Sequence, residues 1–130
     1  MLLTNKILDN LIACAVKSER MRMNFNLHES IDDSVQRLFN AMEPGTKIPI
    51  HRHLDSAETI IVLRGKLSVS YFASNKKETD SFLLEVGTEN FGIHIPKGTW
   101  HGVDVIEPGT VIFEVKEGPY APLTETDILS

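Results

Sequence analysis

The chain has 130 residues, the size of one domain with a hydrophobic core of its own. Hydrophobic residues make up 42% of the sequence and charged residues 24%, shares that are typical of a soluble globular protein and that exclude disordered and membrane classes. The net charge is -5 and no basic cluster occurs, which argues against nucleic acid as a partner because phosphate binding depends on Lys and Arg. We therefore expect a small-molecule or protein partner, with no nucleic acid and no membrane.

The N-terminal segment predicts a short amphipathic helix over about residues 4–18. Its apolar residues recur at intervals of three and four: Ile7, Leu8, Leu11, Ile12, Ala15 and Val16. Thr4 precedes this pattern and could serve as the N-cap. The single cysteine, Cys14, lies on the expected apolar face, which favours a small buried hydrophobe over a catalytic thiol. One cysteine cannot form an internal disulfide and no signal peptide is evident, so we expect a cytoplasmic location.

Polar and apolar residues alternate strictly in the next segment, from Met21 to His28, which indicates a strand. One face of this strand would carry Arg22, Asn24, Asn26 and His28. A polar face of this kind is either exposed to water or part of a hydrogen-bonded pocket, because buried polar groups without partners are costly.

From residue 35 onward the chain predicts short strands separated by turn residues. The expected strands are 35–42, 51–53, 59–63, 67–72, 81–86, 92–95, 101–106 and 111–115. Breaks fall at turn sequences such as Pro44-Gly45 and Pro108-Gly109. The spacing favours an all-β barrel or jelly-roll sandwich without βαβ units. We expect an N-terminal helical segment, 1–20, and a single barrel domain, 21–130, that ends in an ordered tail.

Three histidines and a glutamate are candidates for one metal site. His51 and His53 are two residues apart, so on a strand both side chains leave the same face. Glu58 can return from the start of the next strand, and His101 follows a Pro-x-Gly turn on another strand. A His-x-His pair alone is often a surface feature. The four together suit one divalent transition metal ion (Fe, Mn, Ni, Co or Zn) better than Ca or Mg.

The complete run around the first three candidates carries a family resemblance. It reads Gly45, five residues, His51-x-His53, four residues, Glu58, six residues and Gly65, without a gap. This run resembles the first conserved motif of the cupins. The resemblance implies a cupin fold, that is, a double-stranded β-helix or jelly-roll barrel, here with a short N-terminal helix. It also implies a homodimer, because small cupins commonly pair through their sheets.

A second cupin motif is only partly present. Pro96, Gly98 and His101 resemble it, whereas Asn90 stands at its glycine position and Val105 at its asparagine position. Neither departure touches a metal ligand. They put in doubt the geometry of the turn that follows Asn90.

The flanks resemble a narrower family, the WbuC family of small cupin-fold metalloproteins. The segments that carry this resemblance are Arg22 to His28, Ser34 to Leu38, Pro44 to His53 and Phe113 to Tyr120. Members are often encoded among surface-polysaccharide genes, and no reaction is settled for them. The resemblance spans about residues 20 to 122 and implies that Asn24, Asn26 and His28 line a pocket.

Four further residues are candidates for the same pocket, and each has two interpretations. Arg37 has apolar neighbours and is either a snorkelling side chain or a clamp for an anionic substrate. Glu114 and Lys116 share one face of the last strand and either form a structural ion pair or act as acid and base near the metal. Tyr120 either packs in the tail or supplies a hydroxyl to the pocket.

Two functions fit these features. The first is a metal-dependent enzyme that acts on a sugar-derived or other small anionic or polar substrate in surface-polysaccharide biosynthesis. Isomerase, epimerase and lyase chemistry fit, as does dioxygenation with ferrous iron. The second is a non-catalytic module that binds or senses a small molecule, because the fold does not decide between them. The catalytic candidates are Glu114, His28 and Lys116, and the substrate-binding candidates are Asn24, Asn26, Arg37 and Tyr120.

Overall fold

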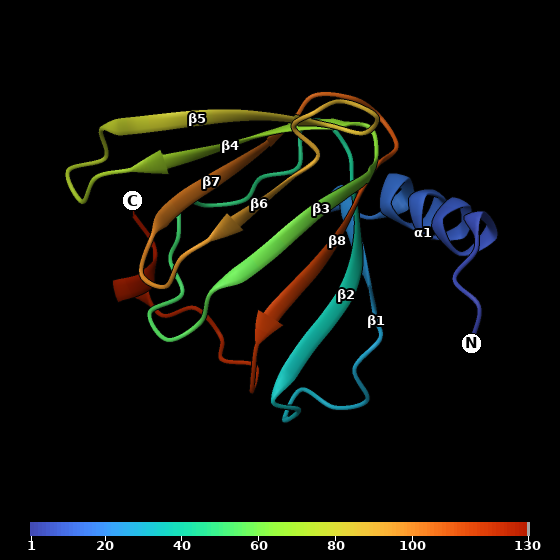
Figure 1. The fold of residues 1–130 in the computed structure, drawn as a ribbon, viewed down its shortest axis with the longest axis horizontal. Coiled ribbons are helices and arrows are strands. Elements are labelled where there is room, and N and C mark those ends of the chain that lie inside the picture. Colours follow the sequence, from blue (N-terminus) through green and yellow to red (C-terminus); the bar gives the residue numbers. More distant parts are fainter. Residues whose placement is uncertain (130) are drawn as a thin grey trace.

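A computed structural model describes residues 1–129 and consists of two antiparallel β-sheets, with one helix against the outside of the larger sheet (Figure 1). The larger sheet has the order β1 (Arg22–Asn26), β2 (Val35–Met42), β8 (Thr110–Glu117), β3 (Glu58–Arg64) and β6 (Gly92–Ile95). The smaller sheet has the order β5 (Glu78–Glu85), β4 (Lys66–Phe72) and β7 (Trp100–Val105). The predicted all-β fold with a short N-terminal helix is confirmed.

The strands follow the predicted pattern except at one place. β2 and β6 have the predicted bounds, and the other named strands begin and end within three residues of them. Residues 51–53 do not form a regular strand, because only His51 makes isolated bridges, to His101 and to Ile128. Pro49 precedes this segment and has no N–H to continue a ladder.

The helix α1 (Asn5–Lys17) packs on the outer face of the larger sheet. Thr4 occupies the N-cap position, but its side chain makes no capping hydrogen bond. Leu11 and Ala15 are the buried helix residues, and they pack against Phe39, Ala41 and Val111 of the sheet. Cys14 is exposed, so the prediction that it is buried is wrong. The contact face is centred near Leu11 and Ala15, and Cys14 is rotated by about 100° from Ala15 around the helix axis.

The hydrophobic core lies between the two sheets. Its buried members are Met42, Ile60, Val62, Leu67, Val69, Leu84, Ile95, Val105 and Ile112. Three of them, Met42, Ile60 and Ile112, also line a cavity described below. The apolar core therefore continues directly into the wall of that cavity, which gives the cavity a well-packed base.

The glycine that ends the first motif, Gly65, is required by close packing. It connects β3 to β4 with a φ of +81°, a conformation that side chains rarely adopt. A Cβ at this position would overlap with Thr110, which is fully buried at the start of β8. Asn90, at the glycine position of the second motif, has no positive φ, so the turn there does not need a glycine.

The C-terminal segment lies beside the segment that carries two candidate ligands. The N–H of Leu129 donates to the carbonyl of Ile50 (2.8 Å), and the N–H of Arg52 donates to the carbonyl of Asp127 (3.0 Å). On its other side, His51 exchanges two backbone hydrogen bonds with His101 of β7 (3.0 and 2.9 Å). Residues 50–52 are therefore held between β7 and the end of the chain.

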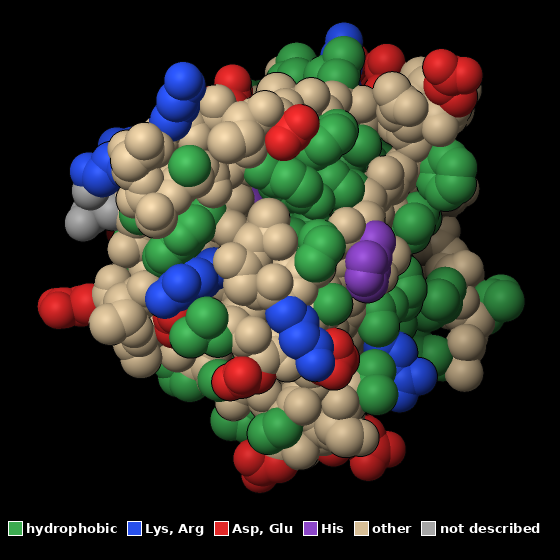
Figure 2. Space-filling view, turned by 60° about the vertical axis from the view of Figure 1, so that its left-hand side comes forward, with side chains coloured by type: hydrophobic (Ala, Val, Ile, Leu, Met, Phe, Trp, Pro, Cys, Tyr) green, Lys and Arg blue, Asp and Glu red, His purple; other side chains and the backbone are tan. Residues whose placement is uncertain are grey.

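The surface mixes apolar and charged groups. Figure 2 shows hydrophobic side chains gathered in a patch on one face, with Lys, Arg, Asp and Glu side chains scattered around it. Exposed apolar residues of the smaller sheet include Phe82 and Leu83. Within residues 1–129, no helix has the length and apolar character needed to cross a bilayer.

Candidate metal centre

The four candidate ligands come from three parts of the fold. His51 and His53 belong to the segment before β3, Glu58 is the first residue of β3, and His101 is the second residue of β7. One donor atom from each lies within 4.8 Å of the donor atoms of the other three. The structure therefore brings together residues that are up to 50 positions apart in the sequence, in a group that could hold one metal ion.

Hydrogen bonds orient two of the imidazoles. Nδ1 of His51 lies 2.8 Å from the carbonyl of Pro49, and Nδ1 of His101 lies 2.9 Å from the carbonyl of Thr99. A carbonyl only accepts, so in each ring Nδ1 carries a hydrogen and Nε2 is the nitrogen left to bind a metal. This support from the backbone is typical of metal-binding histidines, and the set of three imidazoles and one carboxylate fits a divalent transition metal ion.

Glu58 and His101 form a buried pair. Oε1 of Glu58 lies 2.9 Å from Nε2 of His101, and their side chains are 9% and 1% exposed. Burial by itself lowers the pKa of His101, but the hydrogen bond and the charge of Glu58 raise that pKa above its ordinary value. Burial by itself raises the pKa of Glu58, but the hydrogen bond and the charge of His101 hold that pKa below its ordinary value. The carboxylate is therefore charged at neutral pH.

The other two imidazoles are kept neutral. Burial, followed by the charge of His101, lowers the pKa of His51. Burial and the charge of Lys116 lower the pKa of His53 to about 4. Both rings therefore offer a lone pair at neutral pH, which is the state that binds a metal.

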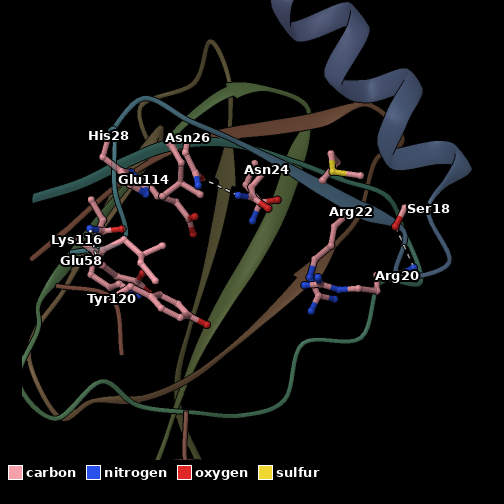
Figure 3. Close-up of a pocket in the computed structure, with 15 residues that line it drawn as sticks. Ser18, Arg20, Arg22, Asn24, Asn26, His28, Glu58, Glu114, Lys116 and Tyr120 are labelled. Carbon is pink, nitrogen blue, oxygen red and sulfur yellow. Dashed lines mark hydrogen bonds between the residues drawn. The ribbon is translucent and has the colours of Figure 1, made fainter. Parts of the chain in front are cut away.

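The ligands line a hollow of about 230 Å³, which adjoins a larger hollow of about 620 Å³. The two share their border residues Arg22, Asn40, Glu58, Glu114 and Lys116. The larger hollow lies along the inner face of β1, β2 and β8 (Figure 3). Its size is that of cavities that bind small molecules, and many of the side chains that line it are polar.

Most of the predicted pocket residues lie at this larger hollow. Asn24, Asn26, His28 and Tyr120 line it. Nδ2 of Asn24 donates to Oδ1 of Asn26 (2.7 Å). Nδ1 of His28 contacts the backbone N and O of Arg37 (3.1 and 3.0 Å), so Nε2 is the free ring nitrogen. The polar face of β1 therefore borders a cavity, which agrees with its interpretation as part of a hydrogen-bonded pocket.

Arg37 lies outside both hollows, so the structure disfavours its interpretation as a substrate clamp. Alternate residues of β2, namely Gln36, Leu38 and Asn40, line the larger hollow. Arg37 has the opposite parity on the strand, is exposed, and lines neither hollow. The sequence showed correctly which residues share a face with Arg37, but not which face points inward.

Glu114 and Lys116 lie on the border between the two hollows. In the part of the chain that the structure describes they form no direct ion pair. Nζ of Lys116 instead lies 5.8 Å from the ring centre of Tyr120. Burial, with the charge of Glu58, raises the pKa of Glu114 to about 8. The structure thus disfavours the structural ion pair and leaves Glu114 as a group that can hold a proton at neutral pH.

Sequence reasoning missed the contacts that hold the ligand segment from outside. Arg52 lies between two ligands in the sequence, and its guanidinium lies 4.4 Å from the ring centre of Trp100. Its Nε lies 3.5 Å from Oδ1 of Asp127, and its Nη2 donates to the carbonyl of Thr126 (3.2 Å). Strand alternation could have placed Arg52 opposite the histidines, but no local signal identifies a partner 75 residues away.

Comparison with known families identifies the group to which this chain belongs. The chain belongs to the family described as a domain of unknown function, DUF6016, whose sequence model matches residues 3–84. No curated protein has a significantly similar sequence.

Solved structures resemble the chain more widely. CapF, a capsular polysaccharide assembling protein from Staphylococcus aureus, is 19% identical with a TM-score of 0.65, over 81% of this chain and 28% of that chain. KdgF from Halomonas sp. is 18% identical with a TM-score of 0.59, over 77% of this chain and 82% of that one. The Cnp3 cupin domain of Schizosaccharomyces pombe is 14% identical with a TM-score of 0.60, over 76% and 66%. The match therefore spans little more than a quarter of the CapF chain.

These likenesses show the fold, and the predicted cupin fold is confirmed. Together with the group formed by His51, His53, Glu58 and His101, they support a metal-binding cupin. The resemblance to the WbuC family stays a prediction.

Proposed function

We propose that this protein is a metal-dependent cupin enzyme that acts on a sugar-derived or other small polar or anionic molecule. One observation carries the proposal: His51, His53, Glu58 and His101 converge at a hollow that adjoins a cavity with many polar side chains, large enough for a small molecule. A divalent metal ion held by these ligands would polarise a carbonyl or hydroxyl oxygen, or acidify a bound water.

The residues around the two hollows would transfer protons, stabilise charge and contact the substrate. Glu114 would donate or accept a proton at the substrate, because it borders both the metal hollow and the larger cavity. Lys116 would stabilise negative charge that develops on an oxygen nearby. His28, with Nε2 free, and Tyr120 would contact the substrate farther along the larger cavity, as would the amides of Asn24 and Asn26.

The wider context is also a proposal. We place the protein with the WbuC type of cupin, in surface-polysaccharide biosynthesis in the cytoplasm. The structural neighbour CapF is described as a capsular polysaccharide assembling protein, which agrees with a sugar-derived substrate. We propose a homodimer as well, and the apolar patch in Figure 2 supports a surface that pairs. Light scattering across a range of protein concentrations would test the dimer.

The first experiment is metal analysis of protein purified without chelators. We expect close to one transition metal ion per chain, and a content near zero in His51→Ala and His101→Ala. The matched control is His94→Ala, because His94 is exposed, lies outside the ligand group and contacts Thr59 through Nδ1 (2.9 Å). Unchanged metal content in both ligand variants would refute the metal site.

The second experiment separates an enzyme from a binding module. Metal-loaded protein is assayed for isomerisation, epimerisation, elimination and oxygen uptake with simple sugars and nucleotide sugars. Any turnover should be lost in Glu114→Gln while the metal content is retained. A compound that raises the melting temperature but is never converted would contradict the enzyme and favour a module that senses or carries a small molecule.

A further inference from the structure

Two arginines lie at one end of the larger hollow. Figure 3 shows Arg20 and Arg22 with their guanidinium groups close together at one end, whereas Glu58, Glu114 and Lys116 lie at the other end. The labelled residues that lie nearest to the arginines in this view, Ser18 and Asn24, are not acidic. The two ends of one cavity therefore differ in chemistry.

The position of Arg22 is held by hydrogen bonds that use only part of its side chain. Nη1 donates to Oγ1 of Thr46 (3.1 Å) and to the carbonyl of Lys47 (3.1 Å). Oγ1 of Thr46 in turn donates to the carbonyl of Arg20 (2.6 Å), which ties the start of β1 to the 46–47 loop. Nε and Nη2 of Arg22 make no hydrogen bond to the protein within residues 1–129, so these donors are available to a ligand.

The pair also lacks a counter-charge. The ion pairs found among the described residues involve Arg52, Arg64, Lys97 and His101, and neither Arg20 nor Arg22 takes part in one. Burial and the charge of Arg20 lower the pKa of Arg22, as expected for two neighbouring cations. No carboxylate of the described residues pairs with either arginine, and a bound anion would relieve the repulsion between them.

We propose that Arg20 and Arg22 bind an oxyanion group, a carboxylate or a phosphate, of the molecule whose other end reaches the metal centre. Arg22 makes this connection possible because it lines both hollows. Asn24 and Asn26 follow Arg22 on the same face of β1 and would hydrogen-bond the part of the molecule in between. The inference rests on the proposed function for the metal end, but the anion site itself requires only the arginines.

The test uses two small probes, inorganic phosphate and acetate, which represent the two sources of an oxyanion. Each is titrated into metal-loaded protein at constant ionic strength, and the Nε–H signals of the arginines are followed by NMR. We expect saturable shifts at Arg20 and Arg22. Arg20→Gln and Arg22→Gln should each weaken binding about tenfold, because each removes charge-assisted hydrogen bonds.

The matched control is Arg37→Gln, an arginine on the opposite face of β2 that lines neither hollow. Binding that shifts Arg20 and Arg22 and survives in Arg37→Gln supports the site, and the better-bound probe shows whether a phosphate or a carboxylate is preferred. The absence of saturable shifts, or an equal loss of binding in Arg37→Gln, would overturn it.

A repeat on chelator-treated protein separates this inference from the proposed function. The arginine shifts should persist without metal, whereas the arginine variants should retain the full metal content of the wild type. Phosphate binding that vanishes with the metal and leaves the arginine signals unmoved would place the anion on the metal and would overturn the arginine site. A protein that binds phosphate at Arg20 and Arg22 but never binds metal would refute only the metal-dependent function.

Discussion

The metal group and the β1 face border the same cavity, but they are built very differently. Glu58 and His101 are buried, and His51 and His101 are oriented by backbone carbonyls. The side chains of Asn24 and Asn26 are exposed on β1, an edge strand of the larger sheet. The first region therefore has little freedom to vary, whereas the second can change its side chains without disturbing the core.

This contrast assigns different tasks to the two regions. A metal site requires donor atoms within a few tenths of an ångström of their ideal positions, so its residues need support from the packed interior. Selection of a small molecule depends on a few polar groups placed along a cavity wall. We infer that the buried group determines what chemistry is available and that the β1 face determines which molecule receives it.

The largest effect is expected from Glu58→Gln. The substitution removes the one anionic ligand and leaves Nε2 of His101 without its buried carboxylate partner. Metal affinity should fall about a hundredfold or more, measured by competition with a chelator of known affinity. Glu78→Gln, at an exposed glutamate of β5, is the control and should change nothing. An equal affinity in Glu58→Gln would show that the carboxylate is not a ligand.

The next effect concerns the support behind the ligand segment. Arg52→Ala or Asp127→Ala removes the contact that joins residues 50–52 to the C-terminal segment. We expect metal affinity to fall about tenfold to a hundredfold, because outer contacts hold the ligands in place. Lys97→Ala breaks an ion pair with Glu117 whose side chains are both 57% exposed, so it should have almost no effect. If Arg52→Ala lowered metal affinity no more than Lys97→Ala does, the C-terminal segment would not position the site.

Metal binding should also weaken as the pH falls. Among the three imidazoles, His101 should gain a proton first on acidification, because Glu58 raises its pKa. That proton then competes with the metal for Nε2. Below that pKa the affinity should fall about tenfold per pH unit, as expected for one proton released on binding. His53, with a pKa of about 4, should compete only in more acidic solution. Metal affinity that is constant from about pH 8 to pH 5 would contradict this order.

The same pair gives the metal-free protein a defined window of stability. The raised pKa of His101 means that its contribution is complete at low pH and is lost as the pH rises through that pKa. The lowered pKa of Glu58 means that its contribution is lost as the pH falls through its own pKa. Thermal unfolding of chelator-treated protein should therefore show the pair's stabilisation between these two limits, and Glu58→Gln should abolish it.

The smallest effect is expected on the β1 face. Asn24→Ala removes an exposed hydrogen bond to Asn26, so the free energy of unfolding should change by less than about 0.5 kcal/mol. Metal content should stay at the level of the wild type, which thermal unfolding and metal analysis would check together. A loss of metal in this variant would show that the two regions are coupled, contrary to the division described above.

Much of the architecture could be predicted because it depends on local patterns. Strand alternation and turn residues predicted β2 and β6 with their bounds, and the spacing of His51, His53 and Glu58 predicted a shared site. The first motif ends in a glycine, Gly65, because a side chain at this position would overlap with Thr110. In each case a short stretch of sequence contains the full physical constraint.

Other features could not be predicted because they depend on which face turns inward. Alternation showed that Arg37 shares a face with Val35, but only pairing with β8 and cover by the helix decided that this face points away from the cavity. The helical pattern likewise placed Cys14 near the apolar side, but the helix packs on the sheet around Leu11 and Ala15 and leaves Cys14 exposed. The periodicity of a strand or helix shows which residues share a face, but it does not show which face is buried.

By itself, the sequence determined the strands, the turns and the identity of the candidate ligands, because these follow from backbone preferences and side-chain chemistry over a few residues. Only the tertiary structure decided that Arg52 meets Asp127, that Arg20 and Arg22 share one end of a cavity, and that Glu114 borders the metal group. The first and third of these contacts join positions far apart in the chain, and all three depend on the packing of whole sheets against one another.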